Sequence, residues 1–120
     1  MRLLVPGFFL NTPQDRLAEL AKYYDLPLVT SKSLLTASIR EKSCLGDRVK
    51  RCLESGKFIP DSLFLQLLEE KLTESDMRRG WILAGFPRTL SQAAALNSML
   101  LDIDQFYDRV IYFKRDNQHS

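Results

Sequence analysis

The chain has 120 residues, of which 45% are hydrophobic and 27% are charged, and its formal net charge is +2. This length and composition are those of a single globular domain, and so small a charge argues against nucleic acid or an anionic membrane as a partner. Cys44 and Cys52 lack metal-type spacing, and no apolar run reaches the length of a membrane span. We therefore expect a cytoplasmic protein with free thiols.

The first half of the chain alternates predicted strands with predicted helices. A short apolar strand is expected at residues 3–5, followed by a helix that starts with Thr12 as N-cap and Pro13 at the first helical position. A second strand is expected at residues 26–29. Thr30 then suits the start of a helix whose apolar residues recur at helical spacing.

The middle of the chain predicts two helices joined by a turn. Gly56 suits the C-terminal end of one helix, and Asp61 suits the N-cap of the next. The apolar residues between positions 63 and 72 recur at spacings of three and four, so they predict a helix face packed on the core.

A strand, a tight turn and a helix start follow one another in the second half. Residues 81–84 have the length of a buried strand, and the Gly-Phe-Pro sequence at 85–87 turns the chain. Thr89 suits the N-cap of the helix that follows. Arg88 and Gln92 are thereby expected at the carboxyl edge of a sheet, where open α/β sheets bind ligands. A guanidinium there suits a phosphate or a carboxylate.

These elements together predict an α/β fold, a doubly wound parallel sheet of about four strands flanked by helices. A last apolar run at residues 110–113 is expected to form an edge strand, followed by a polar tail at residues 114–120. We expect one domain over residues 1–120.

The segment Gly-Trp-Ile-Leu-Ala-Gly-Phe-Pro-Arg-Thr-Leu-Ser-Gln-Ala, which begins at Gly80, resembles the signature of adenylate kinases. The resemblance covers residues 1–113 and implies a P-loop-kinase-like core at 1–29 and 61–113. It also implies a helical insertion at 30–60 that holds a nucleoside monophosphate. On the positions that match the family, the implied AMP-binding residues are Ser31, Lys57, Phe58, Ile59, Gly85, Arg88 and Gln92.

Three residues depart from the family pattern at places that serve phosphoryl transfer. Pro13 stands where the family has the phosphate-loop lysine, Thr36 where it has an arginine for the AMP phosphate, and Ala84 where it has an aspartate. A phosphate loop depends on converging backbone N–H groups and a cation, and Pro13 supplies neither.

The resemblance covers roughly the first half of the family's fold, so the lid with its arginines and the C-terminal elements are expected to be missing. Because phosphoryl transfer depends on cations around the transferring group, we predict no useful kinase turnover. Arg88 is the one family phosphate-contacting arginine that is kept. We expect no metal site and no ATP–Mg²⁺ site.

Two functions stay open at this point. In the first, the chain is a pseudoenzyme that still binds AMP or another nucleoside monophosphate. In the second, it is a structural or interaction protein, because an edge strand and an incompletely covered sheet invite pairing with a second copy or a partner protein. A truncated product of a longer protein and a weakly active nucleotide phosphotransferase are further alternatives.

Overall fold

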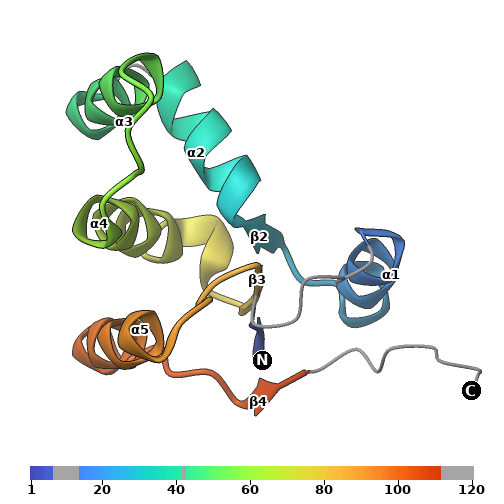
Figure 1. Ribbon diagram of the computed structural model, residues 1–120. Helices are drawn as coiled ribbons and strands as arrows, with labels where there is room; N and C mark the ends of the chain where they lie inside the picture. The colour runs from blue at the N-terminus through green and yellow to red at the C-terminus, as the bar shows by residue number, and fades with distance from the viewer. Residues whose placement is uncertain (7–13, 42, 112–120) are drawn as a thin grey trace, which may run out of the picture.

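The computed structural model describes residues 1–6, 14–41 and 43–111, and these residues form an α/β structure (Figure 1). The predicted helix start at Thr12 and Pro13, the end of the predicted last strand at 112–113 and the polar tail at 114–120 lie outside the described residues. The described elements are, in chain order, β1 (Arg2–Val5), α1 (Gln14–Tyr24), β2 (Leu28–Thr30), α2 (Ser31–Arg40), α3 (Cys44–Glu54), α4 (Asp61–Leu72), the 3-10 helix η1 (Ser75–Met77), β3 (Trp81–Ala84), α5 (Leu90–Asp102) and β4 (Arg109–Val110).

The four described strands form one parallel sheet in the order β2-β3-β1-β4. Ala84 at the end of β3 lies opposite Val5 of β1 on one side and Thr30 of β2 on the other. Three strands therefore end together at one carboxyl edge. This confirms the predicted doubly wound parallel sheet of about four strands.

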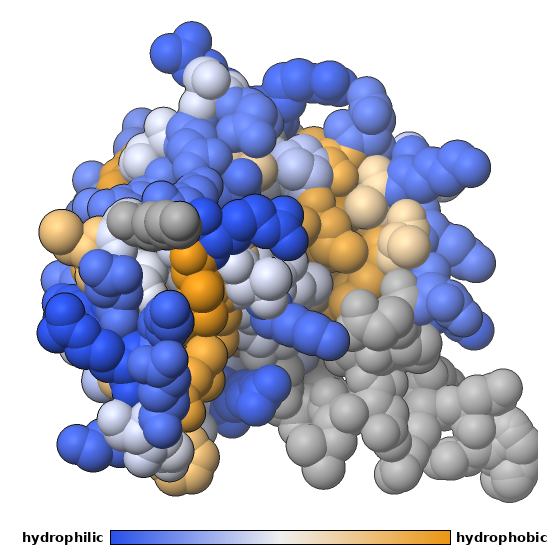
Figure 2. Space-filling view, turned by 90° about the horizontal axis from the view of Figure 1, so that it is seen from above, coloured by the Kyte–Doolittle hydropathy of each residue, from blue (hydrophilic) through white to orange (hydrophobic). Residues whose placement is uncertain are grey.

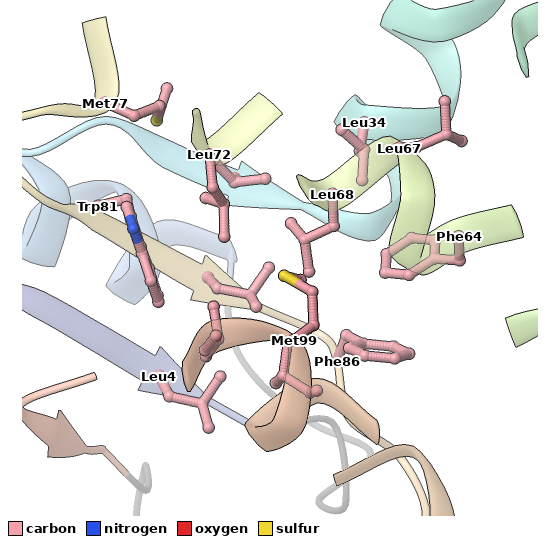
Figure 3. Packing of buried hydrophobic residues seen from close by; sticks show 14 of the residues in the cluster. Leu4, Leu34, Phe64, Leu67, Leu68, Leu72, Met77, Trp81, Phe86 and Met99 are labelled. Carbon is pink, nitrogen blue, oxygen red and sulfur yellow. The ribbon is translucent and has the colours of Figure 1, made fainter. Parts of the chain in front are cut away.

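Side chains alternate between the two faces of the sheet, as the strand period of two requires. On one face, Leu3, Val5 and Ile82 pack against Leu17 of α1. On the other face, α2, α4 and α5 cover the sheet, and α3 packs against α2 and α4 farther from the strands (Figures 1 and 3). The buried side chains of this cluster include Leu34, Val49, Phe64, Leu67, Leu68, Leu72, Leu96, Met99 and Leu100. This second, larger core holds the helices around the carboxyl edge of β3.

Helix starts and stops follow the local sequence at most of the predicted positions. The Thr30 hydroxyl accepts from the Ser33 N–H at 3.0 Å, and the Ser33 side chain returns a contact to the Thr30 backbone. Gly56 follows α3 with a φ of +71°, a conformation that glycine adopts without steric cost. The prediction of Asp61 as N-cap is wrong: Pro60 is the N-cap of α4, and Asp61 is the first helical residue. Its carboxylate is therefore free to bond elsewhere.

The strand β4 lies at the edge of the described sheet and pairs with β1 alone. Asp108 fixes its start, because its carboxylate accepts from the Arg2 N–H at 2.7 Å and its own N–H donates to the Arg2 carbonyl at 2.7 Å. The Ile111 N–H continues the ladder by donating to the Leu4 carbonyl. The strand begins at Arg109, one residue earlier than predicted, and the predicted edge position is confirmed. None of the helices in the described ranges is long and apolar enough to span a membrane.

Candidate functional site

A cleft of about 190 Å³ opens at the carboxyl end of β3. α2 forms one wall, the start of α5 forms another, and the residues around the beginning of α4 close the third side. The residues that line it are Ser31, Leu35, Ile59, Asp61, Phe64, Gly85, Phe86, Arg88 and Gln92. Five of these, Ser31, Ile59, Gly85, Arg88 and Gln92, are site residues that the sequence predicted, although they come from three separate segments of the chain.

Gly85 forms the floor of the cleft directly after β3. Its φ is +86°, and its N–H donates to the Val5 carbonyl at 3.1 Å, so the chain leaves the sheet in a left-handed turn. A Cβ at this position would lie 3.3 Å from the Ser31 hydroxyl oxygen. The glycine therefore permits both the turn and the close approach of α2.

Arg88 lies in the turn between β3 and α5, and its side chain is exposed to solvent. Its Nε–H donates to the Gly85 carbonyl at 3.3 Å, which is a long hydrogen bond. Among the described residues, no carboxylate lies within ion-pair distance of this guanidinium. The rest of its donor fork is therefore available to a phosphate or carboxylate of a ligand.

Two hydrogen bonds hold the side chain of Gln92 in one orientation. Its Oε1 accepts from the Arg88 backbone N–H at 2.8 Å, and its Nε2 donates to Asp61 Oδ1 at 2.9 Å. The Thr89 hydroxyl caps the helix by accepting from the Gln92 N–H at 3.1 Å, as the sequence predicted. The turn, the helix start and the first residue of α4 are thus tied together at one end of the cleft.

An apolar wall faces these polar groups. The rings of Phe64 and Phe86 lie close together (Figure 3), with centroids 4.6 Å apart and planes tilted by 36°. Leu35 and Ile59 also line the cleft. Aromatic and aliphatic walls of this kind, combined with a few fixed polar groups, suit a flat ring such as a nucleobase.

Two predicted site residues are not among those lining the cleft. Lys57 and Phe58 lie in the segment between α3 and α4, and the Phe58 side chain is 96% exposed. Thr36, at the position of the family arginine, lies on the outer surface of α2, where it lines a separate hollow with Lys32 and Arg40.

The sequence prediction missed four residues of the cleft: Leu35, Asp61, Phe64 and Phe86. Leu35 and Phe64 are predicted on apolar helix faces by their periodicity, whereas Phe86 belongs to the predicted turn. Phe64 and Phe86 are buried, and Leu35 is partly buried. Asp61 carries only the signal of a helix start. Its contact with Gln92, which lies 31 residues further along the chain, has no local signal. Within the described part of the chain, no cluster of three or more His, Cys, Asp or Glu side chains could hold a metal ion.

A parallel sheet in this order, with a cleft at the carboxyl end of β3, is the arrangement of the P-loop-kinase-like class of α/β proteins. The family model described as "Adenylate kinase" matches residues 15–119, which is more than half of the chain. The chain belongs to the adenylate kinase family.

Relatives named adenylate kinase are similar to the chain over most of its length. One from Cyanothece sp. is 42% identical over 106 residues, covering 88% of this chain and 53% of its own length. One from Coxiella burnetii is 39% identical over 100 residues, covering 83% of this chain and 42% of its own length. One from Staphylococcus aureus is 32% identical over 94 residues, covering 78% and 44% respectively. The chain spans about half the length of these curated relatives.

Proposed function

We propose that this chain is a nucleoside-monophosphate-binding module with AMP as its ligand, and that by itself it does not catalyse phosphoryl transfer. The observation that carries the proposal is the gathering of Ser31, Ile59, Gly85, Arg88 and Gln92 around one cleft of about 190 Å³. Relatives similar to this chain are named adenylate kinase, an enzyme class that acts on AMP, which supports this choice of ligand.

The cleft offers separate groups for the two ends of a nucleotide. The Arg88 guanidinium supplies charged donors for the phosphate, and charge-assisted bonds of this kind are stronger than neutral ones. Phe64, Phe86 and Ile59 supply an apolar surface for the base. The Gln92 amide, held by two hydrogen bonds, supplies a fixed polar group for the edge of the base.

The absence of turnover is proposed from residue types at the positions that serve transfer in the family. Pro13, Thr36 and Ala84 replace a lysine, an arginine and an aspartate of the family pattern. Catalysis of phosphoryl transfer comes from positioning and charge stabilisation, and loss of one such group commonly costs orders of magnitude in rate. We therefore describe the module as a pseudoenzyme whose first loop does not bind ATP–Mg²⁺.

The binding proposal is tested by calorimetric titration of the chain with AMP. Arg88→Ala should weaken AMP binding by about ten- to a hundred-fold, which is the range expected for a charge-assisted hydrogen bond. Arg51→Ala on α3 removes the same charge away from the cleft and should leave the affinity unchanged. Absence of AMP binding to the unaltered chain at millimolar concentration would refute the proposal.

An interaction protein is the second candidate, and the position of β4 favours it. β4 is an edge of the described sheet. Leu101, near the end of α5, is 65% exposed, and Phe106, between α5 and β4, is 38% exposed. Figure 2 views the molecule from above, on the side away from β4, and on that face too hydrophobic side chains form patches among hydrophilic ones. Sedimentation should show concentration-dependent association if this candidate is correct, and a monomer at all concentrations would count against it.

A further inference from the structure

Basic residues are concentrated in the segment that runs from α2 to the turn after α3. Residues 31–57 contain seven Lys or Arg and three Asp or Glu, whereas the rest of the chain contains ten and twelve respectively. α2 and α3 pack together at the end of the molecule away from β4 (Figure 1). The net charge of +2 for the whole chain therefore conceals a basic end, and so small a charge excludes an anionic partner only where charges are evenly spread.

Two large apolar side chains are exposed where α3 ends. Leu53 is 52% exposed and Phe58 is 96% exposed, the highest value for a large hydrophobic side chain in the described ranges. The Gly56 N–H donates to the Leu53 carbonyl at 3.2 Å, and the Lys57 N–H donates to the Cys52 carbonyl at 2.9 Å. These bonds turn the chain back on the last turn of α3, so Phe58 follows directly from the turn that carries Leu53.

Cations accompany these two apolar side chains. Lys50 and Leu53, three residues apart, are neighbours on the surface of α3, and the Lys57 side chain is exposed between Leu53 and Phe58 in sequence. Among the described residues, neither lysine is in an ion pair. Lys57 and Phe58 were predicted site residues, but they do not line the cleft at β3, so the proposed function leaves them without a role.

We propose that Lys50, Leu53, Lys57 and Phe58 form a docking surface for an anionic lipid bilayer. Phe58 and Leu53 enter the boundary between the headgroups and the acyl chains, and the two lysines contact the anionic headgroups. Lysine suits this arrangement because its alkyl stem lies along apolar surface while its ammonium group stays in water. The inference is independent of AMP binding, because it concerns residues outside the cleft.

The composition of this surface favours a bilayer over a protein partner. Lysine is depleted at protein–protein interfaces, where the strongest contacts are side chains buried in packed pockets. Phe58 instead stands free at the end of a helix, and a bilayer takes up such a side chain without a complementary pocket. Single-stranded RNA is the competing partner, because bases stack on exposed aromatic rings and phosphates attract cations.

Cosedimentation with vesicles tests the proposal. The unaltered chain should bind vesicles of equimolar phosphatidylcholine and phosphatidylserine but not vesicles of phosphatidylcholine alone, and added salt should release it. Phe58→Ala and Lys57→Glu should each lower the partition coefficient about tenfold. The matched controls are Leu101→Ala on α5 and Arg16→Glu on α1, which change exposed residues elsewhere and should leave the coefficient unchanged.

Phe58→Trp reports directly on insertion. Trp81 is fully buried, so its emission should stay constant. The added indole should shift its emission to the blue on vesicle binding and should be quenched by lipids that carry bromine on their acyl chains. Because Phe58 and Lys57 are exposed, their variants should unfold in urea as the unaltered chain does, and this measurement establishes that each is folded.

Four results would overturn the proposal. They are absence of vesicle binding by the unaltered chain, equal losses in Leu101→Ala or Arg16→Glu, an added indole that stays in water on the bound chain, and unchanged binding in Phe58→Ala. Single-stranded RNA that bound through Phe58 and Lys57, with no binding to vesicles, would replace the bilayer with a nucleic acid. The proposed function stands or falls separately, because AMP titration of the unaltered chain tests it without vesicles.

Discussion

β1 and β3 end side by side at one edge of the sheet, and the sequences that follow them differ in what they can offer a ligand. Val5 and Ala84 are direct partners in the parallel ladder. After β3, Gly85, Arg88 and Gln92 face a cleft. After β1, the sequence places Pro13 where the family has a lysine.

On our proposal, the fold keeps one half of a two-substrate site without the other. Strands, caps and core packing depend on hydrophobic pattern and turn residues, whereas phosphate binding depends on particular cations and N–H groups. The hydrophobic pattern of the strands is present in both β1 and β3, which are buried in the sheet. The groups that phosphate binding requires are present, on our proposal, only after β3.

The largest expected effect tests whether core packing holds α5, the helix that begins at the cleft. Leu96 is fully buried in that core, so Leu96→Ala should lower the free energy of unfolding by about 2–5 kcal/mol in urea titrations. Leu101→Ala, on the same helix but 65% exposed, should change it by less than about 0.5 kcal/mol. Equal effects of the two substitutions would mean that α5 is not held by the packing described.

Two glycines with positive φ allow the effect of the turn after β3 on binding to be distinguished from the general cost of backbone strain. Gly85→Ala and Gly56→Ala both force a residue with a Cβ into a positive φ, and each should cost about 1–3 kcal/mol of stability in urea unfolding. Only the Cβ at position 85 would crowd Ser31, whereas the one at position 56 would meet nothing within 4 Å. AMP binding should weaken in Gly85→Ala alone. Equal losses of binding would remove the link between this turn and the ligand.

A further variant restores one of the cations that the family pattern has and this chain lacks. Thr36→Arg should tighten AMP binding about tenfold, because it adds a charged donor at the position where the family has one. Turnover should stay absent, because Pro13 and Ala84 are unchanged. Ala37→Arg adds the same charge to the next exposed position of α2 and should have a smaller effect. Equal tightening in the two variants, measured by calorimetry, would indicate a general charge effect.

The smallest expected effect concerns the N-cap of α5 at Thr89. The Thr89 hydroxyl accepts from the Gln92 N–H, so Thr89→Ala should cost about 1 kcal/mol in the free energy of unfolding. Thr89→Ser retains the hydroxyl and should cost only a fraction of that amount. If serine and alanine were equally destabilising in urea titrations, the methyl group rather than the cap would account for the loss.

The sequence predicted the sheet, the N-caps at Thr30 and Thr89 and the part of the cleft that local signals carry, whereas the N-cap predicted at Asp61 was wrong. The turn at Gly85 and the caps at Thr30 and Thr89 depend on neighbouring residues, so they could be found by pattern. The contact of Asp61 with Gln92 could not, because it depends on how α4 packs against α5. The exposed position of Phe58 depends in the same way on the path of the chain between α3 and α4.

Mapping the backbone amide shifts of the labelled chain during titration with AMP, and separately with ATP and Mg²⁺, tests the central claim most directly. The account predicts saturable AMP shifts at Ser31, Ile59, Gly85 and Gln92, and only weak ATP shifts that compete for the same cleft. Saturable ATP shifts at residues 7–15 would contradict it, because the segment after β1 would then be a working phosphate loop. AMP shifts scattered away from the cleft would contradict it equally.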